Sequence, residues 1–461
     1  MGEKDIGVVG LGVMGLALAL NLKDNGKKVV GSNRSAGPRE RARAAGLDVV
    51  DTLDAMATEL ARPRVVLLSV PAGAAVDTVI EGLAPHLEDG DIVIDSGNSH
   101  YTDSERRTAE LAKRGILFSG TGVSGGEEGA RHGPAIMVGC AEQAYGRLKP
   151  LFDAIAAKFE GEPCSGWMGP GGAGHFVKMV HNGIEYADMQ LIAEIDLVLR
   201  DGMGFDEAGS ADTFARWNEG PLASYLVEIT AEVLRARDPA TDEPVVRIIA
   251  DRAGQKGTGR WTGLSAIELG VPAPSIIAAV QARALSSATA ARHEASSGRD
   301  HPPARIDLSR ETLADALLAA KISAYAQGFM LLSAAAQEHG WPFRAGAVAA
   351  VWRAGCIIRA RLLDDIMHAA ERGMGPAGLL AAAPLSGMID DALPGLRATV
   401  AACAKEGIPA PALSSALAWI DGMRAPKVGA SLIQAQRDFF GAHGFERIDK
   451  EGQFHLDGSG S

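Results

Sequence analysis

One segment of the chain concentrates side chains that can do acid–base chemistry, the stretch FVKMVHNGIEYADMQ that begins at Phe176. If this stretch is helical, residues at i, i+3, i+4, i+7 and i+8 share one face: they are Lys178, His181, Asn182, Glu185 and Tyr186. A Lys and a Glu on one face can serve as base and acid, because burial and their mutual charge move both pKa values. A solvated polar face is the alternative. The apolar positions on the other faces and the glycine-rich start favour a packed helix.

A glycine motif near the N-terminus indicates a nucleotide. Gly10-Leu11-Gly12-Val13-Met14-Gly15 follows the apolar run IGVVG and opens a helical pattern, which is the context that makes GxGxxG a dinucleotide-binding signal. Its glycines let the backbone approach a pyrophosphate, whose charge is offset by the N-terminal N–H groups and dipole of the helix. A plain glycine turn is the alternative.

The end of the second predicted strand bears on which dinucleotide binds. An acidic residue there would accept the ribose hydroxyls of NAD, but this chain has Asn33-Arg34-Ser35. An arginine between two small hydrogen-bonding residues suits a 2′-phosphate, so the pattern favours NADP over NAD. The alternative is that Arg34 is only a solvated surface charge.

Two further loops carry groups that suit anions. Ser124-Gly125-Gly126 offers small side chains and backbone N–H groups for a carboxylate or phosphate oxygen, and a loop without a ligand is its alternative. Gln255-Lys256-Gly257-Thr258-Gly259 has the Lys, Thr and glycines of an anion site but not the P-loop spacing, so a kinase is not favoured. Three other polar residues show no pattern of their own: Arg283, Arg437 and His443.

The elements that position these groups fall into two kinds. From Ile6 to about Phe118, short apolar β-branched runs alternate with helical patterns, which predicts βα units on a parallel sheet. The runs Val65 to Val70 and Ile92 to Ile94 lack polar alternation, as expected of strands covered on both faces. The glycine-rich segment Gly166 to Gly174 breaks both helix and strand patterns, and we place the domain boundary there.

Beyond that boundary the sequence predicts an almost all-helical domain. Helical periodicity covers Val177 to Leu199, Thr312 to Glu338 and Ala345 to Ala370. Lys178 to Glu194 is followed by Trp217-x-x-Gly220, and Lys321 to Gln337 by Trp352-x-x-Gly355, which suggests an ancient duplication. From Pro426 on, one short amphipathic piece among Gly and polar residues predicts a tail. The expected division is 1–171, 172–425 and 426–461.

Composition narrows the class of protein. The chain has 461 residues, 47% hydrophobic and 22% charged, which predicts two or three soluble domains. A net charge of −12 argues against binding to nucleic acid or an acidic membrane. The four cysteines form no CxxC pair, so neither a zinc site nor a disulfide framework is expected. With no apolar signal region and no 18-residue apolar stretch recognised, a cytoplasmic protein is expected.

Taken together, these segments resemble the 6-phosphogluconate dehydrogenases, the decarboxylating family of the pentose phosphate pathway. The resemblance runs along essentially the whole chain through GLGVMG, NRS, DSGNS, GVSGGEEGARHGP, GHFVKMVHNGIEYADMQL, QKGTGRWT and IQAQRDFFGAH. It implies a Rossmann-type α/β N-terminal domain, a large all-α domain with a duplicated helical core, and a C-terminal tail that enters the partner subunit of a homodimer. It also implies NADP-dependent conversion of 6-phosphogluconate to ribulose 5-phosphate and CO2, without a metal.

The resemblance also implies roles for single residues. Lys178 would take the proton of the substrate 3-hydroxyl, and Glu185 would protonate C1 of the enediol left after CO2 departs. The carboxylate, hydroxyls or nicotinamide would meet Asn98, Ser124, Gly125, Gly126, His181 and Asn182. The phosphate would meet Tyr186, Lys256, Thr258 and Arg283, with Arg437 and His443 arriving from the other subunit. The cofactor would lie on Gly10, Leu11, Gly12, Val13, Met14, Gly15, Asn33, Arg34, Ser35, Val70 and Asn98.

The chain departs from the family pattern in two places. The family often has GxAxxG where this chain has GLGVMG, a change that pyrophosphate binding tolerates. It commonly has a Lys where Pro71 stands, so a contact near the adenine is lost and the expected affinity for NADP, though not the preference, falls.

Two other functions remain open from the sequence. A related β-hydroxyacid dehydrogenase, such as one acting on 3-hydroxyisobutyrate, would share GxGxxG and the lysine helix but lack the phosphate-binding set Lys256, Thr258, Arg283 and Arg437. A catalytically silent redox sensor would bind NADP without turnover, which the presence of Lys178 and Glu185 argues against.

Overall fold

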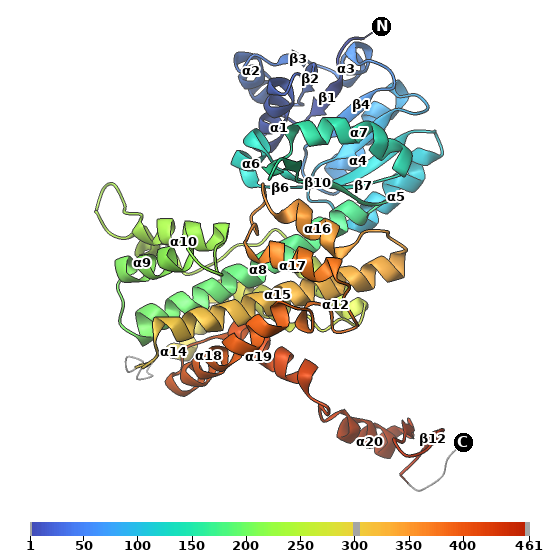
Figure 1. Cartoon of the computed structure of the whole chain (residues 1–461). Coiled ribbons are helices and arrows are strands. Elements are labelled where there is room, and N and C mark those ends of the chain that lie inside the picture. The colour runs from blue at the N-terminus through green and yellow to red at the C-terminus, as the bar shows by residue number, and fades with distance from the viewer. Residues whose placement is uncertain (1, 298–304, 457–461) are drawn as a thin grey trace. The chain divides into compact units, whose positions relative to one another are not determined.

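The computed structural model describes residues 2–297 and 305–456. The chain forms two compact units, Met1–Leu417 and Ala418–Ser461. The first unit contains an eight-stranded sheet and a set of packed helices, and the second contains a short helix and a hairpin (Figure 1).

The sheet has the strand order β10-β7-β6-β5-β4-β1-β2-β3. Its neighbours pair in parallel except β6 and β7, which are antiparallel. The strands are β1 (Ile6–Val9), β2 (Val29–Ser32), β3 (Asp48–Val50), β4 (Val65–Leu68), β5 (Ile92–Asp95), β6 (Leu117–Ser124), β7 (Ala135–Cys140) and β10 (Ser165–Gly169). The predicted βα units and parallel sheet are confirmed over β1 to β6.

The prediction that Gly166 to Gly174 interrupts both helix and strand was wrong for the first half of that segment. Ser165–Gly169 forms β10, which pairs in parallel with β7, and the Trp167 indole donates to the carbonyl of Cys140 at 2.8 Å. Only the glycines after Pro170 form the connection to the next helix, α8 (Ala173–Leu197).

Helices cover both faces of the sheet, as the continuous apolar strands predicted. Ile6, Val8 and Ile94 pack on one face with α1 and α7, while Val9, Val66 and Val93 pack on the other with α3, α4 and α5. The helices of this part are α1 (Val13–Asp24), α2 (Ala36–Ala44), α3 (Leu53–Glu59), α4 (Ala74–Leu83), η1 (Ala84–His86), α5 (Tyr101–Ala112), α6 (Gly126–His132) and α7 (Glu142–Ile155), with a small hairpin of β8 (Lys158–Phe159) and β9 (Glu162–Pro163).

The rest of the first unit is built on two long helices, α8 and α15 (Arg310–His339), which pack against each other (Figure 1). The helix predicted over Ala345 to Ala370 is two helices, because Gly355 between them has a left-handed φ of +69°. The other helices are η2 (Val198–Gly202), α9 (Glu207–Trp217), α10 (Tyr225–Arg235), α11 (Val245–Ile248), α12 (Thr258–Glu268), α13 (Pro274–Ser287), α14 (Thr289–Ser296), α16 (Ala345–Trp352), α17 (Leu362–Glu371), η3 (Gly378–Leu380) and α18 (Leu385–Glu406). The first unit ends within α19 (Pro411–Arg424), whose last residues belong to the second unit.

Helix α15 corrects the expectation that no long apolar stretch exists. Among the described residues it alone is long and apolar enough to cross a membrane. However, 83% of its apolar window is buried in the structure, as in the core helix of a folded domain.

The two long helices are joined by a buried ion pair. The Lys321 ammonium on α15 lies 2.7 and 2.8 Å from the two carboxylate oxygens of Asp188 on α8, and 3.3 Å from the Ser224 hydroxyl. The two charged side chains are 2% and 1% exposed. Removing one member of such a pair leaves the other charge buried without its counter-ion.

We therefore expect Lys321→Met to destabilise the protein by about 3–5 kcal/mol, measured from denaturant unfolding curves. Lys149→Met, which breaks the exposed pair with Asp153, is the control and should cost about 1 kcal/mol or less. Replacing Asp188 by leucine as well should recover much of the stability. Equal midpoints for the two single variants would contradict the role given to this pair.

The second unit is held by one carboxylate. Asp438 on α20 (Ala430–Gly441) accepts hydrogen bonds from Gly444 N at 2.8 Å, His455 Nδ1 at 2.6 Å and Leu456 N at 2.9 Å. These bonds fold back the hairpin of β11 (Phe445–Glu446) and β12 (Gln453–Phe454) and lower the pKa of Asp438. The predicted amphipathic piece is thus a helix, and residues 457–461 of the predicted tail lie outside the described residues.

Candidate active site

Helix α8 lies so close to the sheet that one strand position must be glycine. A Cβ added to Gly122 on β6 would stand 2.3 Å from the Cβ of Lys178. Without side chains at such points, the helix packs directly on β6 and β7. Lys178 is held between helix and sheet with 7% of its surface exposed.

The predicted polar face of α8 is largely enclosed: Lys178, His181 and Tyr186 are buried, and Asn182 and Glu185 are half-buried. His181 Nδ1 lies 3.0 Å from Asn182 Oδ1, and Asn182 Nδ2 donates to Thr258 Oγ1 at 3.0 Å. Because the Asn182 oxygen only accepts, His181 donates from Nδ1 and its Nε2 accepts from the Ser124 hydroxyl, 3.2 Å away. The stripe therefore joins the end of β6 to the start of α12, two segments that the sequence singled out separately.

The pKa values of Lys178 and Glu185 are shifted in the directions that an acid–base pair requires. Burial lowers the pKa of Lys178, although the negative charge of Glu185 opposes that shift. Burial raises the pKa of Glu185, against the opposing effect of Lys178 and Arg283. Burial, with the nearby Lys178 ammonium, sets the pKa of His181 well below its usual value, so the imidazole is neutral. A neutral amine and a protonated carboxyl are thereby favoured side by side.

Of the residues predicted to bind the phosphate, Thr258 and Arg283 contact this stripe. The guanidinium of Arg283 on α13 stacks 3.4 Å from the centre of the Tyr186 ring. Thr258 is buried at the start of α12, and Gly257 before it has a left-handed φ of +102°. Lys256 is exposed on the same loop, and no contact of its side chain with the stripe is seen. A fixed guanidinium beside a helix N-terminus suits a phosphate.

The glycine loop after β1 fits a dinucleotide. Gly10 has a φ of +96°, and a Cβ there would stand 2.3 Å from the carbonyl oxygen of Ser69. Asn33 Oδ1 accepts from Leu11 N at 3.0 Å and fixes the loop. No described side chain caps the N-terminus of α1, and its first turn holds no acidic residue. The N–H groups there are available to a pyrophosphate.

The second strand ends in the predicted 2′-phosphate position. Arg39 donates to the carbonyl oxygens of Asn33 at 2.7 Å and Arg34 at 3.0 Å. These two hydrogen bonds fix the backbone of the turn. The side chains of Arg34 and Ser35 are exposed and free to meet a ligand. Val70 is half-buried after β4, and Asn98 is exposed after β5.

Two predicted site residues belong to the second compact unit. Arg437 donates to Gln434 Oε1 at 3.1 Å, and the His443 ring packs against Phe440 at 6.1 Å between ring centres. Their roles remain predictions. Within residues 2–297 and 305–456 no three His, Cys, Asp or Glu side chains are grouped to hold a metal ion, and the metal-free reaction likewise remains a prediction.

Sequence reasoning missed one wall of the site. The Trp352 ring lies edge-on to His181 at 5.5 Å between ring centres, and the Cys356 thiol on the same segment is fully buried. Ala135 N donates to the carbonyl of Gly355 at 3.0 Å, which ties this loop to β7. The repeat of Trp352-x-x-Gly355 marked the segment, but nothing in the local sequence placed it beside α8.

Comparison with known proteins decides the family. Residues 5–169 match the model described as the NAD binding domain of 6-phosphogluconate dehydrogenase, and residues 174–458 match that of its C-terminal domain. This chain belongs to the 6-phosphogluconate dehydrogenase family. The family assignment, the Rossmann-type first domain and the all-helical second domain expected from the sequence are confirmed.

Individual relatives match over their full length. The chain is 46% identical over 466 residues to the NADP(+)-dependent, decarboxylating 6-phosphogluconate dehydrogenase of Bacillus subtilis, with 99% of each chain covered. It is 47% identical to the decarboxylating enzyme of Haemophilus influenzae, covering 98% of this chain and 95% of the relative. The Plasmodium falciparum 6-phosphogluconate dehydrogenase, solved apo, with NADP+ and with 6-phosphogluconate, matches with a TM-score of 0.95 at 39% identity, covering 98% and 99%.

Proposed function

We propose that this chain catalyses the NADP-dependent oxidative decarboxylation of 6-phospho-D-gluconate to D-ribulose 5-phosphate and CO2, forming NADPH. The observation that carries this function is the full-length identity of 46% to a decarboxylating, NADP-dependent relative. The buried Lys178 and the half-buried Glu185, with pKa values shifted in opposite directions, provide the matching acid–base groups. We also propose that the chain is divided into three parts, residues 1–171, 172–425 and 426–461.

Lys178 acts first as a base. Its lowered pKa favours the neutral amine, which takes the proton from the 3-hydroxyl of the substrate. When bound, NADP supplies the acceptor for the hydride that leaves C3. The carbonyl that results lies β to the carboxylate, so loss of CO2 leaves a carbanion delocalised as an enolate. The protonated Lys178 then donates to that oxygen.

Glu185 completes the reaction. Its raised pKa favours the protonated carboxyl, which delivers a proton to C1 of the enediol while the C2 hydroxyl returns its proton to Lys178 and becomes the carbonyl of the product. Its carboxylate oxygen lies 3.8 Å from the neutral His181 ring. The residues that orient the substrate in this proposal are Asn98, Ser124, Gly125, Gly126, His181 and Asn182, with Tyr186, Lys256, Thr258 and Arg283 around the phosphate.

The proposal includes a homodimer in the cytoplasm. Arg437 and His443 lie on a separate compact unit that is folded by its own hydrogen bonds. Such a unit is suited to reach a second copy of the chain and to supply cations to its phosphate site. Neither nucleic acid nor a membrane is expected as a partner of a chain with a net charge of −12.

The test is NADPH formation at 340 nm with the purified protein and 6-phosphogluconate, with CO2 trapped and NAD tried beside NADP. Equal amounts of NADPH and CO2, with the phosphorylated acid alone, support the proposal. Activity on gluconate or 3-hydroxyisobutyrate, or NADPH formation without release of CO2, would show that the chain catalyses a different dehydrogenation. NADP binding without any turnover would support the redox sensor instead.

Selectivity for NADP is expected to depend on Arg34. Arg34→Leu should raise the dissociation constant of NADP by about 10- to 100-fold, because a hydrogen bond to a charged group contributes about 1.5–3 kcal/mol. The dissociation constant of NAD, which lacks the 2′-phosphate, should change little. Calorimetric titration with both cofactors measures the difference, and Arg216→Leu, at an exposed arginine of α9, is the control. Equal weakening of both cofactors would count against a 2′-phosphate contact.

A further inference from the structure

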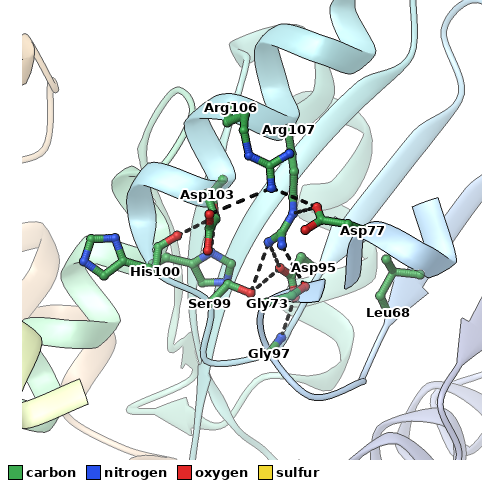
Figure 2. A network of polar contacts seen from close by, with 12 residues as sticks. Leu68, Gly73, Asp77, Asp95, Gly97, Ser99, His100, Asp103, Arg106 and Arg107 are labelled. Carbon is green, nitrogen blue, oxygen red and sulfur yellow. Dashed lines mark hydrogen bonds and ion pairs between the residues drawn. The ribbon is translucent and has the colours of Figure 1, made fainter. Parts of the chain in front are cut away.

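One buried guanidinium joins the two loops that follow β4 and β5. Arg107 on α5, 1% exposed, donates from Nη2 to the carbonyl oxygen of Gly73 at 3.0 Å and from Nε to Asp77 Oδ1 at 2.8 Å. Its Nη1 lies 3.3 Å from Asp95 Oδ2 and 3.4 Å from Ser99 Oγ. Figure 2 shows the guanidinium between Asp77 on one side and Asp95 with Ser99 on the other.

On the β5 side, these contacts fix the turn that carries Asn98. Asp95, at the end of β5, accepts from Gly97 N at 3.0 Å and from the Ser99 hydroxyl at 2.6 Å. Asn98 lies between these two anchored residues and is exposed, whereas Ser99 is buried. The buried carboxylate of Asp95 therefore holds both neighbours of the exposed Asn98, Gly97 through its backbone N–H and Ser99 through its hydroxyl.

On the β4 side, the same guanidinium holds the end of the loop from Val70 to Gly73. Pro71 and Ala72 at its tip are exposed. The two loops are also joined directly, because Ser96 donates to the carbonyl oxygen of Leu68 from its N–H at 3.0 Å and from its hydroxyl at 2.8 Å. Ligands of open α/β sheets bind at the carboxyl ends of parallel strands, where both loops lie.

The contact between Arg107 and Asp95 requires an arginine. Asp95 is fully buried, so its charge needs a cation held in fixed geometry. The planar fork of Arg107 donates in several directions at once and reaches four acceptors on two loops and a helix. A lysine would keep the charge but present a single nitrogen, which cannot span them.

We propose that Arg107 is a positioning residue for the dehydrogenation. It fixes the loops after β4 and β5 relative to each other, so that Asn98 and Val70 face the nicotinamide and the substrate. Arg107 itself touches neither ligand. This inference rests on the function proposed above and on the assignment of Asn98 to the site.

The direct test compares Arg107→Lys with Arg106→Lys. Arg106 is the next residue on the same helix, but it is 43% exposed and binds Asp77 and Glu110 at the surface. We expect Arg107→Lys to lower kcat/KM by about 10- to 100-fold, because small misplacements of groups that orient the reactants are costly. Arg106→Lys should stay within about twofold of the unchanged protein. Equal kinetics for the two variants would overturn the proposal.

A double-mutant cycle with Asn98→Ala separates positioning from a general loss of structure. If Arg107 acts through Asn98, Arg107→Lys should lower kcat/KM much less in the Asn98→Ala background than in the unchanged protein. A full, additive loss in that background would mean that Arg107 acts on something else, and would overturn the proposal.

Two further measurements keep the test decisive. If Arg107→Lys does not fold, Ser99→Ala, which removes one hydroxyl from the same network, should give a smaller loss that is again suppressed by Asn98→Ala. If the unchanged protein has no activity on 6-phosphogluconate, the proposed function fails by itself. Calorimetric NADP binding then decides the inference: a dissociation constant raised at least about tenfold by Arg107→Lys supports it, and an unchanged one overturns it.

Discussion

Replacing Lys178 with methionine is expected to lower kcat by at least about 100-fold, the lower end of what a positioned general base contributes. Methionine fills a similar volume and suits the buried position, so the helix should keep its place. It cannot take a proton from the 3-hydroxyl, and it cannot return one to the enol oxygen. Both oxidation and decarboxylation should therefore fail together.

Two measurements separate this loss from a loss of binding. Calorimetry should show 6-phosphogluconate still binding to Lys178→Met, while stopped-flow absorbance at 340 nm shows no NADPH in the first turnover. Lys256→Met is the control, since its exposed side chain is assigned to the phosphate and should change KM more than kcat. A normal first turnover in Lys178→Met would show that Lys178 is not the general base.

The sequence predicted the parts of the site that lie on one element. Lys178, His181 and Glu185 repeat at helical spacing within α8, so periodicity alone placed them on one face. The glycine motif was recognised for the same reason, because a strand, a tight turn and a helix are contiguous in the chain.

Contacts between distant segments could not be predicted in this way. Lys321 lies 133 positions from Asp188, and nothing in either local pattern names the other as its partner. Gly122 looks like any glycine in a strand until α8 is packed against it. The break at Gly355 was hidden because the apolar periodicity on its two sides continues as if one helix passed through.

Glu185→Gln is the second change expected to have a large effect, and it should act later in the reaction than Lys178→Met. Glutamine has nearly the shape of the protonated carboxyl but donates no acidic proton to C1. Oxidation and loss of CO2 should still occur once, and steady-state turnover should fall by about 100-fold or more. Rapid mixing should then show a burst of about one NADPH per active site followed by a slow rate, whereas Lys178→Met shows no burst.

The pH dependence gives an independent assignment of the two groups. Lys178 must be neutral, so activity falls as the pH drops through its lowered pKa. Glu185 must be protonated, so activity falls as the pH rises through its raised pKa. The unchanged protein should therefore give a bell-shaped profile of kcat, and Glu185→Gln should keep only the rise with pH that belongs to the lysine. If the fall at high pH persists in Glu185→Gln, it belongs to another acid, and the final protonation must be reassigned.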